Sequence, residues 1–423
     1  MAERLLIPRA AFIAVILAAC IAVVSAQEEG TPAVAAPAAP GTRPGMWRVG
    51  PFYLTPKFRI GSVGLDTNVL YTPIERTTDI SASGGPGLEL VLPLGSSGRI
   101  YTDGFLNYLY FVKTKAQRRL TGSARGGFAF NTPRTSFILE ESWLDSFDRP
   151  SFEVNQRVRQ SIEGTRLDIK RRMFGRISLL GLASRAHYEA QSETEYLGND
   201  LESTLTRNEY RAGGGLDYAL SVKTSFVVED EQSWYRYPLD QSRDSTSNRI
   251  WAGFRTDSTA LLAGQAMVGR RFYEFQNAPV KGSATVANVD ALFSISPKTK
   301  FGGSYGRDIA YSQLPTVGSN PLLTTDTYGA RIEKVLATDV DLRIFGTVTQ
   351  IKSENPVSVV VPDEGLVFRL RDDTSRVVGI DLGYRFRPRL RIGVTAAYGD
   401  QTTTIDYFGV EGLIVGATVR FNP

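Results

Sequence analysis

Apolar and polar residues alternate along most of the chain, and they do so most regularly in residues 374–421. The intervening positions hold mainly Gly, Thr, Asp and Arg, so one face of each run is apolar and the other is polar. The apolar positions here are Val378, Ile380, Leu382, Tyr384 and Phe386, then Leu390, Ile392, Val394, Ala396 and Tyr398, and finally Val415, Ala417, Val419 and Phe421. Because the side chains of a strand point alternately to opposite faces, this period of two predicts β-strands.

Two kinds of connection separate the strand-like runs, and they alternate along the chain. Eight are tight turns and nine are longer polar links, so together they join eighteen strands. We predict the tight turns at 95–98, 131–135, 171–175, 221–224, 257–260, 297–300, 338–341 and 387–389. The longer links centre near residues 75, 116, 151, 195, 240, 278, 318, 362 and 403. Strict alternation of short and long connections is typical of an up-and-down barrel in the bacterial outer membrane.

The predicted fold class is therefore all-β, a transmembrane up-and-down antiparallel β-barrel of about 18 strands, within a range of 16–18. A soluble sandwich would also alternate, but it has no reason to sort its aromatic residues. Here Phe128, Phe293 and Phe386 flank tight turns, whereas Tyr108 and Trp234 flank longer links. Two belts of aromatic rings are expected of a wall embedded in lipid. Since every backbone polar group in lipid must be paired, the sheet has to close.

The N-terminus has the features of a secretory signal peptide. Arg4 and Arg9 precede an apolar run that ends in a small-residue cleavage site. We predict a signal peptide over 1–26, cleaved after Ala26. A lipoprotein-type box ending at Cys20 is an alternative, but the residues that follow Cys20 are apolar rather than a polar tether.

The rest of the chain divides into two parts. Residues 27–46 are rich in Ala and Pro, which predicts a disordered periplasmic leader. No later stretch resembles a linker, so residues 47–423 are expected to form one barrel domain.

Composition excludes several kinds of function. The net charge is only +4, which gives no reason to expect a nucleic-acid partner. The chain has a single histidine, His187, which shares a strand face with Arg185 and Glu189 and has no Ser or Asp nucleophile motif beside it. No Cys/His metal cluster and no phosphate-binding loop appear in the sequence. We therefore predict no enzyme activity, no metal and no cofactor.

A family resemblance comes from the first strand. Residues 50–61 run into Asp66-Thr67-Asn68-Val69, and this opening resembles that of outer-membrane β-barrel porin families, particularly one often encoded beside exopolysaccharide export genes. The resemblance implies an outer-membrane location and a connection with polysaccharide. It supplies no functional residues, and we expect Asp66 and Asn68 to cap a strand at the rim.

The polar faces of the strands supply the candidate site residues. A barrel of sixteen to eighteen strands leaves an aqueous lumen unless a loop plugs it. Charges on the inner wall could act across the lumen as a transverse field, or they could only pair with one another along the wall. The candidates that we expect to face the lumen are Arg207, Glu209, Arg211, Asp217, Arg331, Arg343, Asp381, Arg385 and Arg391.

The functional prediction is a porin-like passive channel for small hydrophilic solutes. The alternative is a non-conducting or plugged barrel that supports exopolysaccharide export or surface binding. The link 354–373 reads as a β-hairpin that either folds into the pore or stands outside it. Expected partners are outer-membrane lipid, small polar solutes or polysaccharide, and the outer-membrane assembly machinery, which would meet the aromatic-ended strand at Phe421.

Overall fold

A computed structural model describes residues 47–192, 194–257, 261–277, 280–313, 322–361, 365–387, 389–405 and 408–421. The predictions for the signal peptide, for Cys20 and for the leader 27–46 lie outside the described residues. Within them the chain is almost entirely β-strand, and no described helix is long and apolar enough to cross a membrane.

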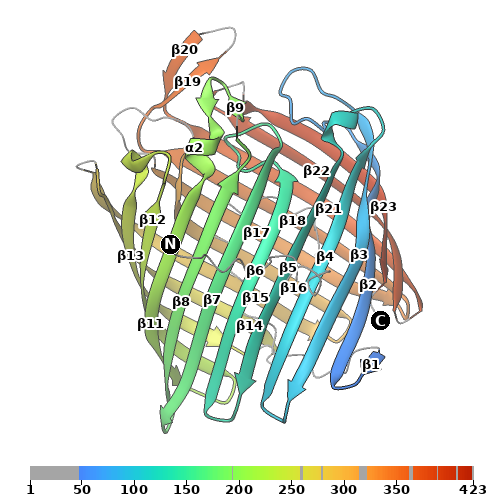
Figure 1. Cartoon of the computed structure of the whole chain (residues 1–423), viewed down its shortest axis with the longest axis vertical. Coiled ribbons are helices and arrows are strands. Elements are labelled where there is room, and N and C mark those ends of the chain that lie inside the picture. Colours follow the sequence, from blue (N-terminus) through green and yellow to red (C-terminus); the bar gives the residue numbers. More distant parts are fainter. Residues whose placement is uncertain are drawn as a thin grey trace, which may run out of the picture.

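Eighteen antiparallel strands form one closed barrel (Figure 1). The first half consists of β2 (Phe52–Asp66), β3 (Asp79–Leu94), β4 (Gly98–Phe111), β5 (Arg119–Asn131), β6 (Thr135–Asp148), β7 (Val158–Phe174), β8 (Ile177–Ala190), β11 (Arg207–Ala219) and β12 (Thr224–Arg236). The second half consists of β13 (Ser245–Thr256), β14 (Leu262–Phe275), β15 (Lys281–Ser296), β16 (Thr299–Tyr311), β17 (Leu322–Ala337), β18 (Val340–Ser353), β21 (Asp372–Arg387), β22 (Leu390–Thr403) and β23 (Val410–Phe421). The last strand pairs with β2, which closes the sheet and confirms the predicted fold class.

Among the described residues, several short strands, two 3₁₀ turns and a short helix lie outside the eighteen barrel strands. The short strand β1 (Trp47–Val49) pairs antiparallel with the first residues of β2 at the short-turn end. The long connections carry the 3₁₀ turns η1 (Lys115–Gln117) and η2 (Gln241–Arg243), the strand pair β9 (Glu195–Tyr196) and β10 (Asn199–Asp200), and the helix α2 (Leu201–Leu205). They also carry a hairpin of β19 (Val357–Val361) and β20 (Gly365–Arg369).

Short and long connections lie at opposite ends of the barrel, as the alternation predicts (Figure 1). One turn prediction, at 171–175, was wrong in position. Strand β7 continues past this run of basic residues to Phe174, with a bulge beside Arg172, and turns at Gly175. Gly175 has φ +53°, a left-handed conformation that glycine adopts without steric cost.

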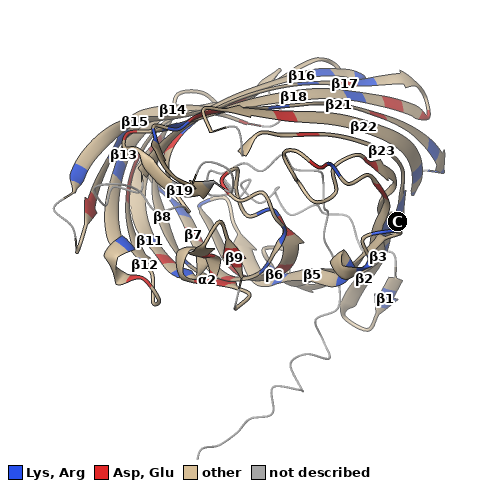
Figure 2. Cartoon of the chain, turned by 90° about the horizontal axis from the view of Figure 1, so that it is seen from above, with Lys and Arg blue, Asp and Glu red and all other residues tan. Residues whose placement is uncertain are grey.

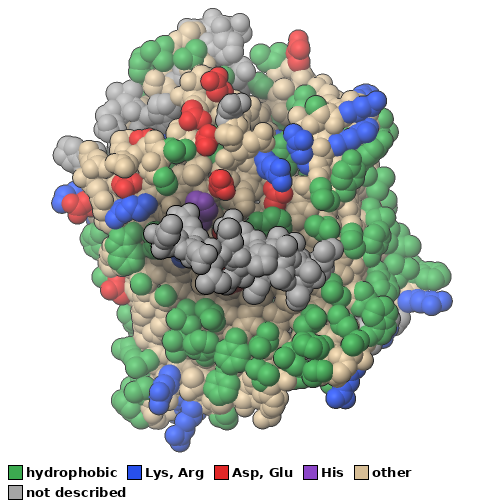
Figure 3. All heavy atoms as spheres, viewed as in Figure 1, with side chains coloured by type: hydrophobic (Ala, Val, Ile, Leu, Met, Phe, Trp, Pro, Cys, Tyr) green, Lys and Arg blue, Asp and Glu red, His purple; other side chains and the backbone are tan. Residues whose placement is uncertain are grey.

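The two faces of the strands differ in chemistry. Leu382 and Val394, which are cross-strand neighbours, are 46% and 56% exposed on the outer face. The opposite face carries charged residues whose exposure varies; Asp217 is 3% exposed, whereas the side chain of Arg385 is 52% exposed. In Figure 3, hydrophobic side chains cover much of the wall, and charged side chains gather towards the two rims.

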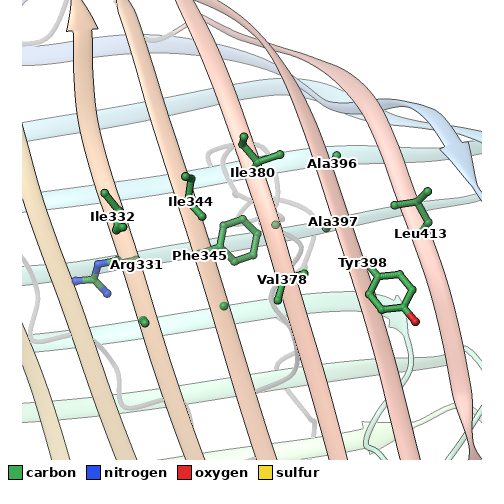
Figure 4. A pocket seen from close by; sticks show the side chains of 13 residues that line it. Arg331, Ile332, Ile344, Phe345, Val378, Ile380, Ala396, Ala397, Tyr398 and Leu413 are labelled. Carbon is green, nitrogen blue, oxygen red and sulfur yellow. The ribbon is translucent and has the colours of Figure 1, made fainter.

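One part of the outer face is hollowed where small residues replace large ones (Figure 4). The hollow has a volume of about 570 Å³ and lies over β17, β18, β21, β22 and β23. Ala330, Gly346 and Ala396 stand among the outward positions there, and larger residues such as Ile380 and Tyr398 surround them. Its lining is apolar apart from Arg331, so this hollow belongs to the outer wall and not to the polar lumen.

An apolar cluster, which we call the mouth cluster, joins four long connections at the other end from the short turns. Its buried members are Val154, Val158, Ala190, Tyr196, Leu201, Leu205, Val357, Val367, Ile405 and Phe408. They come from the connections or strand ends around β6–β7, β8–β11, β18–β21 and β22–β23. The connections at this end are thus packed together rather than independent of one another.

Candidate functional site

The connection 149–157 between β6 and β7 crosses the barrel interior, and we call it the crossing loop. Its contacts are with β16, β18, β21 and β22 or the residues next to them. Strands β7 and β18 lie opposite each other, since β8 and β11–β17 separate them on one side and β2–β6 with β21–β23 on the other, eight strands each way. Figure 2, viewed along the barrel, shows long connections lying over the opening between these walls.

Arg149 gives the crossing loop its compact shape. Its guanidinium donates to the backbone oxygens of Val154 (3.1 Å) and Phe152 (2.8 Å) and to the side chain of Asn155. It also reaches the side-chain oxygen of Gln401 on β22 at 2.9 Å. The Arg149 guanidinium therefore binds several oxygens within the tight loop and also connects this loop to the opposite wall.

An apolar anchor continues this attachment. The ring of Phe152 packs against Leu323, Ile351 and Ala310 on β17, β18 and β16. The backbone oxygen of Phe152 accepts hydrogen bonds from Arg371 and Gln401, both at 3.0 Å. A side chain and a carbonyl of the same residue thus hold the loop against the opposite wall.

A buried ion-pair network completes the attachment. The Glu153 carboxylate accepts hydrogen bonds from the Ser312 hydroxyl at 2.7 Å and from the Gln313 backbone N–H. It pairs with Arg371 at 3.2 Å, and Arg371 pairs in turn with Asp373 at 2.5 Å. Glu153, Arg371 and Asp373 are each only 1% exposed. We call these three residues the tether, because they join the crossing loop to the beginning of β21.

The electrostatics of the tether follow from this burial. Burial raises the pKa of the Glu153 carboxyl, while Arg371, Ser312 and Gln313 act in the opposite direction. For Arg371, burial lowers the pKa, but Asp373 and Glu153 outweigh burial and the net shift is upward. The guanidinium therefore keeps its charge, and it also lies over the ring of Phe408 at 4.5 Å. Removing one partner from such a buried pair typically costs about 3–5 kcal/mol, because the remaining charge is left uncompensated.

The β2–β3 connection braces the base of the crossing loop. Tyr71 adopts φ +56°, which is unusual for a residue with a large side chain. Its hydroxyl donates to Asp148 at 3.0 Å, and Arg149 and Arg157 lie over its ring at 5.9 and 5.1 Å. The strained backbone of Tyr71 is therefore held by contacts to both ends of the crossing loop.

Asp66 and Asn68, the residues of the family resemblance, have a structural role at this rim. Asp66 accepts from the backbone N–H of Asn68 at 2.9 Å. The Asn68 amide donates to the backbone oxygens of Thr72 and Glu411 at 2.9 and 3.0 Å. This agrees with the expected capping role.

The structure brings the predicted lumen residues together in two groups. At the long-connection end of β11, Glu209 binds Arg207 and Arg211, both at 2.9 Å, and Arg207 lies 3.8 Å from the ring centroid of Tyr188. Near the short turns, Arg391 pairs with Asp381 and, at 2.6 Å, with Asp341, which Arg385 also contacts at 3.2 Å. The second group contains Asp341, which was not among the predicted residues.

The other three predicted residues lie apart from these groups. Asp217 pairs with Lys170 at 2.8 Å, Arg331 lies 3.8 Å from Glu333, and Arg343 lies over the Phe345 ring at 5.3 Å. These contacts run along one side of the wall rather than across the lumen. They favour the alternative in which charges on the inner wall pair with near neighbours. A role in solute passage remains a prediction for all nine candidate residues.

His187, the single histidine of the chain, contacts the neighbouring strand. The Nδ1 atom of His187 lies 3.0 Å from the Asn208 side-chain oxygen, on the neighbouring strand. Within the described ranges, no three His, Cys, Asp or Glu side chains gather closely enough to hold a metal ion.

The sequence analysis missed the crossing loop and its tether. It considered only 354–373 as a segment that could fill the pore, and the hairpin found there stands beyond the barrel in Figure 1. A signal for the crossing loop did exist, because Phe152 and Val154 are large apolar residues within an otherwise polar link. The burial of Phe152, however, depends on Leu323 and Ile351, which are more than 150 positions away.

These features define the class of the molecule as a closed eighteen-stranded antiparallel β-barrel with an apolar outer face and a loop folded across its interior. No family model matches the sequence, and no curated protein matches it.

Among solved structures, the FrpB iron transporter from Neisseria meningitidis (F5-1 variant) has a TM-score of 0.46 and 9% identity, covering 82% of this chain and 61% of that one. The outer membrane protein opdK from Pseudomonas aeruginosa has a TM-score of 0.44 and 8% identity, covering 88% and 98%. The ferric enterobactin receptor PfeA from Pseudomonas aeruginosa has a TM-score of 0.44 and 7% identity, covering 87% and 80%. The chain thus spans less than two thirds of the FrpB transporter. Similarities at this level assign neither a ligand nor a mechanism.

Proposed function

We propose that this protein is a porin-like passive channel of the bacterial outer membrane, which admits small hydrophilic solutes and whose bore is narrowed by the crossing loop. The observation that carries the proposal is the crossing loop itself, docked on the wall opposite its own strands through Phe152 and the tether. Eighteen strands leave room for water inside a barrel. A loop held across that space limits the size of the solutes that pass.

The outer-membrane location rests on the apolar outer face and on the sequence. Outward residues such as Leu382 would meet lipid, while the charged inner wall would meet water. In this proposal residues 1–26 direct export and are removed after Ala26, and residues 27–46 remain in the periplasm. The assembly machinery would recognise the last strand, which ends in the described part at Phe421.

One observation favours the second candidate, a plugged barrel that supports exopolysaccharide export or surface binding. The mouth cluster packs four long connections together, so the connections at that end could close the lumen instead of narrowing it. The hairpin of β19 and β20 would then be a surface for binding, since Leu366 and Phe368 on β20 and Leu370 just after it are exposed.

Single-channel recording of the refolded mature protein in a planar bilayer separates the two candidates. The channel predicts stable current steps, and swelling of liposomes in small sugars that stops as sugar size increases. Absence of both signals from protein that shows the heat-modifiable gel shift of a folded barrel would contradict the channel and favour the plugged barrel.

Shortening the hairpin should leave the current unchanged. Replacing residues 360–366 by Asn-Gly removes the tip and keeps Val357 and Val367, which belong to the mouth cluster. Because β19 and β20 stand beyond the barrel, we expect conductance and solute size limit equal to those of the unmodified protein. An increase in conductance would mean that the tip, and not the crossing loop, restricts the lumen.

A further inference from the structure

Four arginines lie side by side on the inner wall near the short turns, and we call them the arginine belt. Arg385 on β21 is the cross-strand partner of Arg391 on β22, which is the partner of Arg420 on β23, which in turn is the partner of Arg59 on β2. Their side chains face inward, since the residues before and after each of them on its strand are apolar and point outward; Phe58, Phe386 and Ile392, for example, are exposed. Like charges directly opposite each other destabilise a sheet, so barrel stability does not explain this arrangement.

The nearby carboxylates do not neutralise the belt. Asp341 serves both Arg385 and Arg391, and Asp381 pairs with Arg391. Arg343 on β18, the cross-strand partner of Asp381, adds a fifth guanidinium. Glu333, the partner of Arg343 on its other side, pairs with Arg331 instead. Leaving Arg59 aside, four of these arginines face two aspartates among the described residues, which leaves an excess of two positive charges on this part of the wall.

Two members of this group are open to a solute. Arg343 is exposed, and among the described residues its guanidinium interacts only with the ring of Phe345. Arg420 is exposed and makes no hydrogen bond or ion pair with any described residue. Uncommitted guanidinium groups on a water-filled wall are suited to bind anions, because their N–H donors match the oxygens of a carboxylate or phosphate.

Buried atoms at the same place also lack partners. The Nη1 atom of Arg391 and the hydroxyl of Thr418 have no hydrogen-bond partner among the described residues. Thr418 is only 3% exposed, so its hydroxyl has little contact with water either. Both lie close to where a side chain at Gly393 would begin, at 3.0 and 3.1 Å. Gly383 makes similar room, since a side chain there would meet the guanidinium of Arg391. These glycines let Arg391 lie flat against the wall, with donor capacity that the protein leaves unused.

We propose that the arginine belt, with Arg343, is a binding station for small organic or inorganic oxyanions, either carboxylates or phosphates, on their way through the lumen. This inference rests on the proposed channel function, because it assigns a solute class to that channel. The anion would be held by the forked donors of Arg420 and of Arg385, which gives only its Nε–H to Asp341 and has a side chain 52% exposed, and it would leave by exchange with the neighbouring arginines.

Isothermal titration calorimetry on the folded barrel in detergent, at low ionic strength, tests the station without requiring conduction. Inorganic phosphate and succinate are titrated separately, and we expect the native protein to bind at least one of them; which one binds distinguishes the two oxyanion sources. The double variant Arg385→Gln/Arg420→Gln should bind about tenfold more weakly or worse, since it removes two charge-assisted contacts. Arg376→Gln, which removes an arginine from the outer face of β21, is the matched control and should bind normally.

The outcomes separate this inference from the channel proposal. Unchanged binding in the double variant, or no binding of either anion to the native protein, overturns the station whether or not the barrel conducts. Binding that depends on Arg385 and Arg420 in a barrel that carries no current supports the station and rejects the channel. In a conducting barrel, the double variant should also lose anion selectivity, measured as a shift of the reversal potential in a KCl gradient.

Discussion

Arg371→Met is expected to give larger and noisier current steps than the native protein, because it releases the crossing loop from the far wall. The substitution keeps the bulk of the side chain but removes the cation between Glu153 and Asp373. Two buried carboxylates would then face each other without compensation. At about 3–5 kcal/mol, this loss lowers the ratio of docked to undocked loop by at least a hundredfold.

The control for this prediction is an ion pair at the same end of the barrel that is not buried. Lys352 and Asp372 form such a pair at 3.4 Å, and both side chains are more than half exposed. Lys352→Met should therefore leave the current unchanged, since exposed pairs contribute little. Glu153→Gln should have a smaller effect than Arg371→Met, because Arg371 keeps its ion pair with Asp373 and the one amide oxygen can still accept from either Ser312 or Gln313. Equal currents in all these variants would show that the tether does not control the bore.

Leu382→Arg is expected to block assembly of the barrel. Leu382 lies on the outer face of β21, among apolar neighbours, and Arg in its place would put a charge into the middle of the lipid. The cost is roughly 2–4 kcal/mol for a barrel residue at that depth. The measurement is the fraction of protein that shows the heat-modifiable gel shift after refolding into liposomes.

Thr395→Arg provides the matched control. Thr395 stands on the neighbouring strand β22 and faces inward, directly opposite Asp381 and Gly416. The same new charge would here meet a carboxylate and water instead of lipid, so assembly should proceed normally. A gel shift reduced to the same extent in both variants would contradict the assignment of the two faces.

The architecture could be predicted because it depends on local pattern. Alternation with a period of two assigns Val378 and Ile380 to one face without knowledge of any partner, and the rhythm of the connections gives the strand number. The misplaced turn near Gly175 shows the limit of this reasoning. The basic residues before it resemble a turn in composition, but they extend β7 beyond the rim, where charged side chains reach water.

The contacts of the site could not be predicted in the same way. Alternation predicts that Arg391 faces inward, but its pairing with Asp341 depends on the register of strands that lie far apart in sequence. The crossing loop has no period at all. Its position depends on Glu153 meeting Arg371, 218 residues away, which no local pattern encodes.

The central claim is that the crossing loop spans the lumen and docks on the opposite wall, and cross-linking tests it most directly. The Ser151 hydroxyl lies 2.6 Å from the Gln313 side-chain oxygen, and the only cysteine of the chain, Cys20, lies in the predicted signal peptide. In the variant Ser151→Cys/Gln313→Cys, a short bis-maleimide should join the two positions in the folded barrel and alter its mobility on a denaturing gel. The control pair Ser151→Cys/Ser97→Cys, with Ser97 in a short turn at the other end, should not react in this way. Absence of the cross-link between positions 151 and 313 in folded protein would contradict the account.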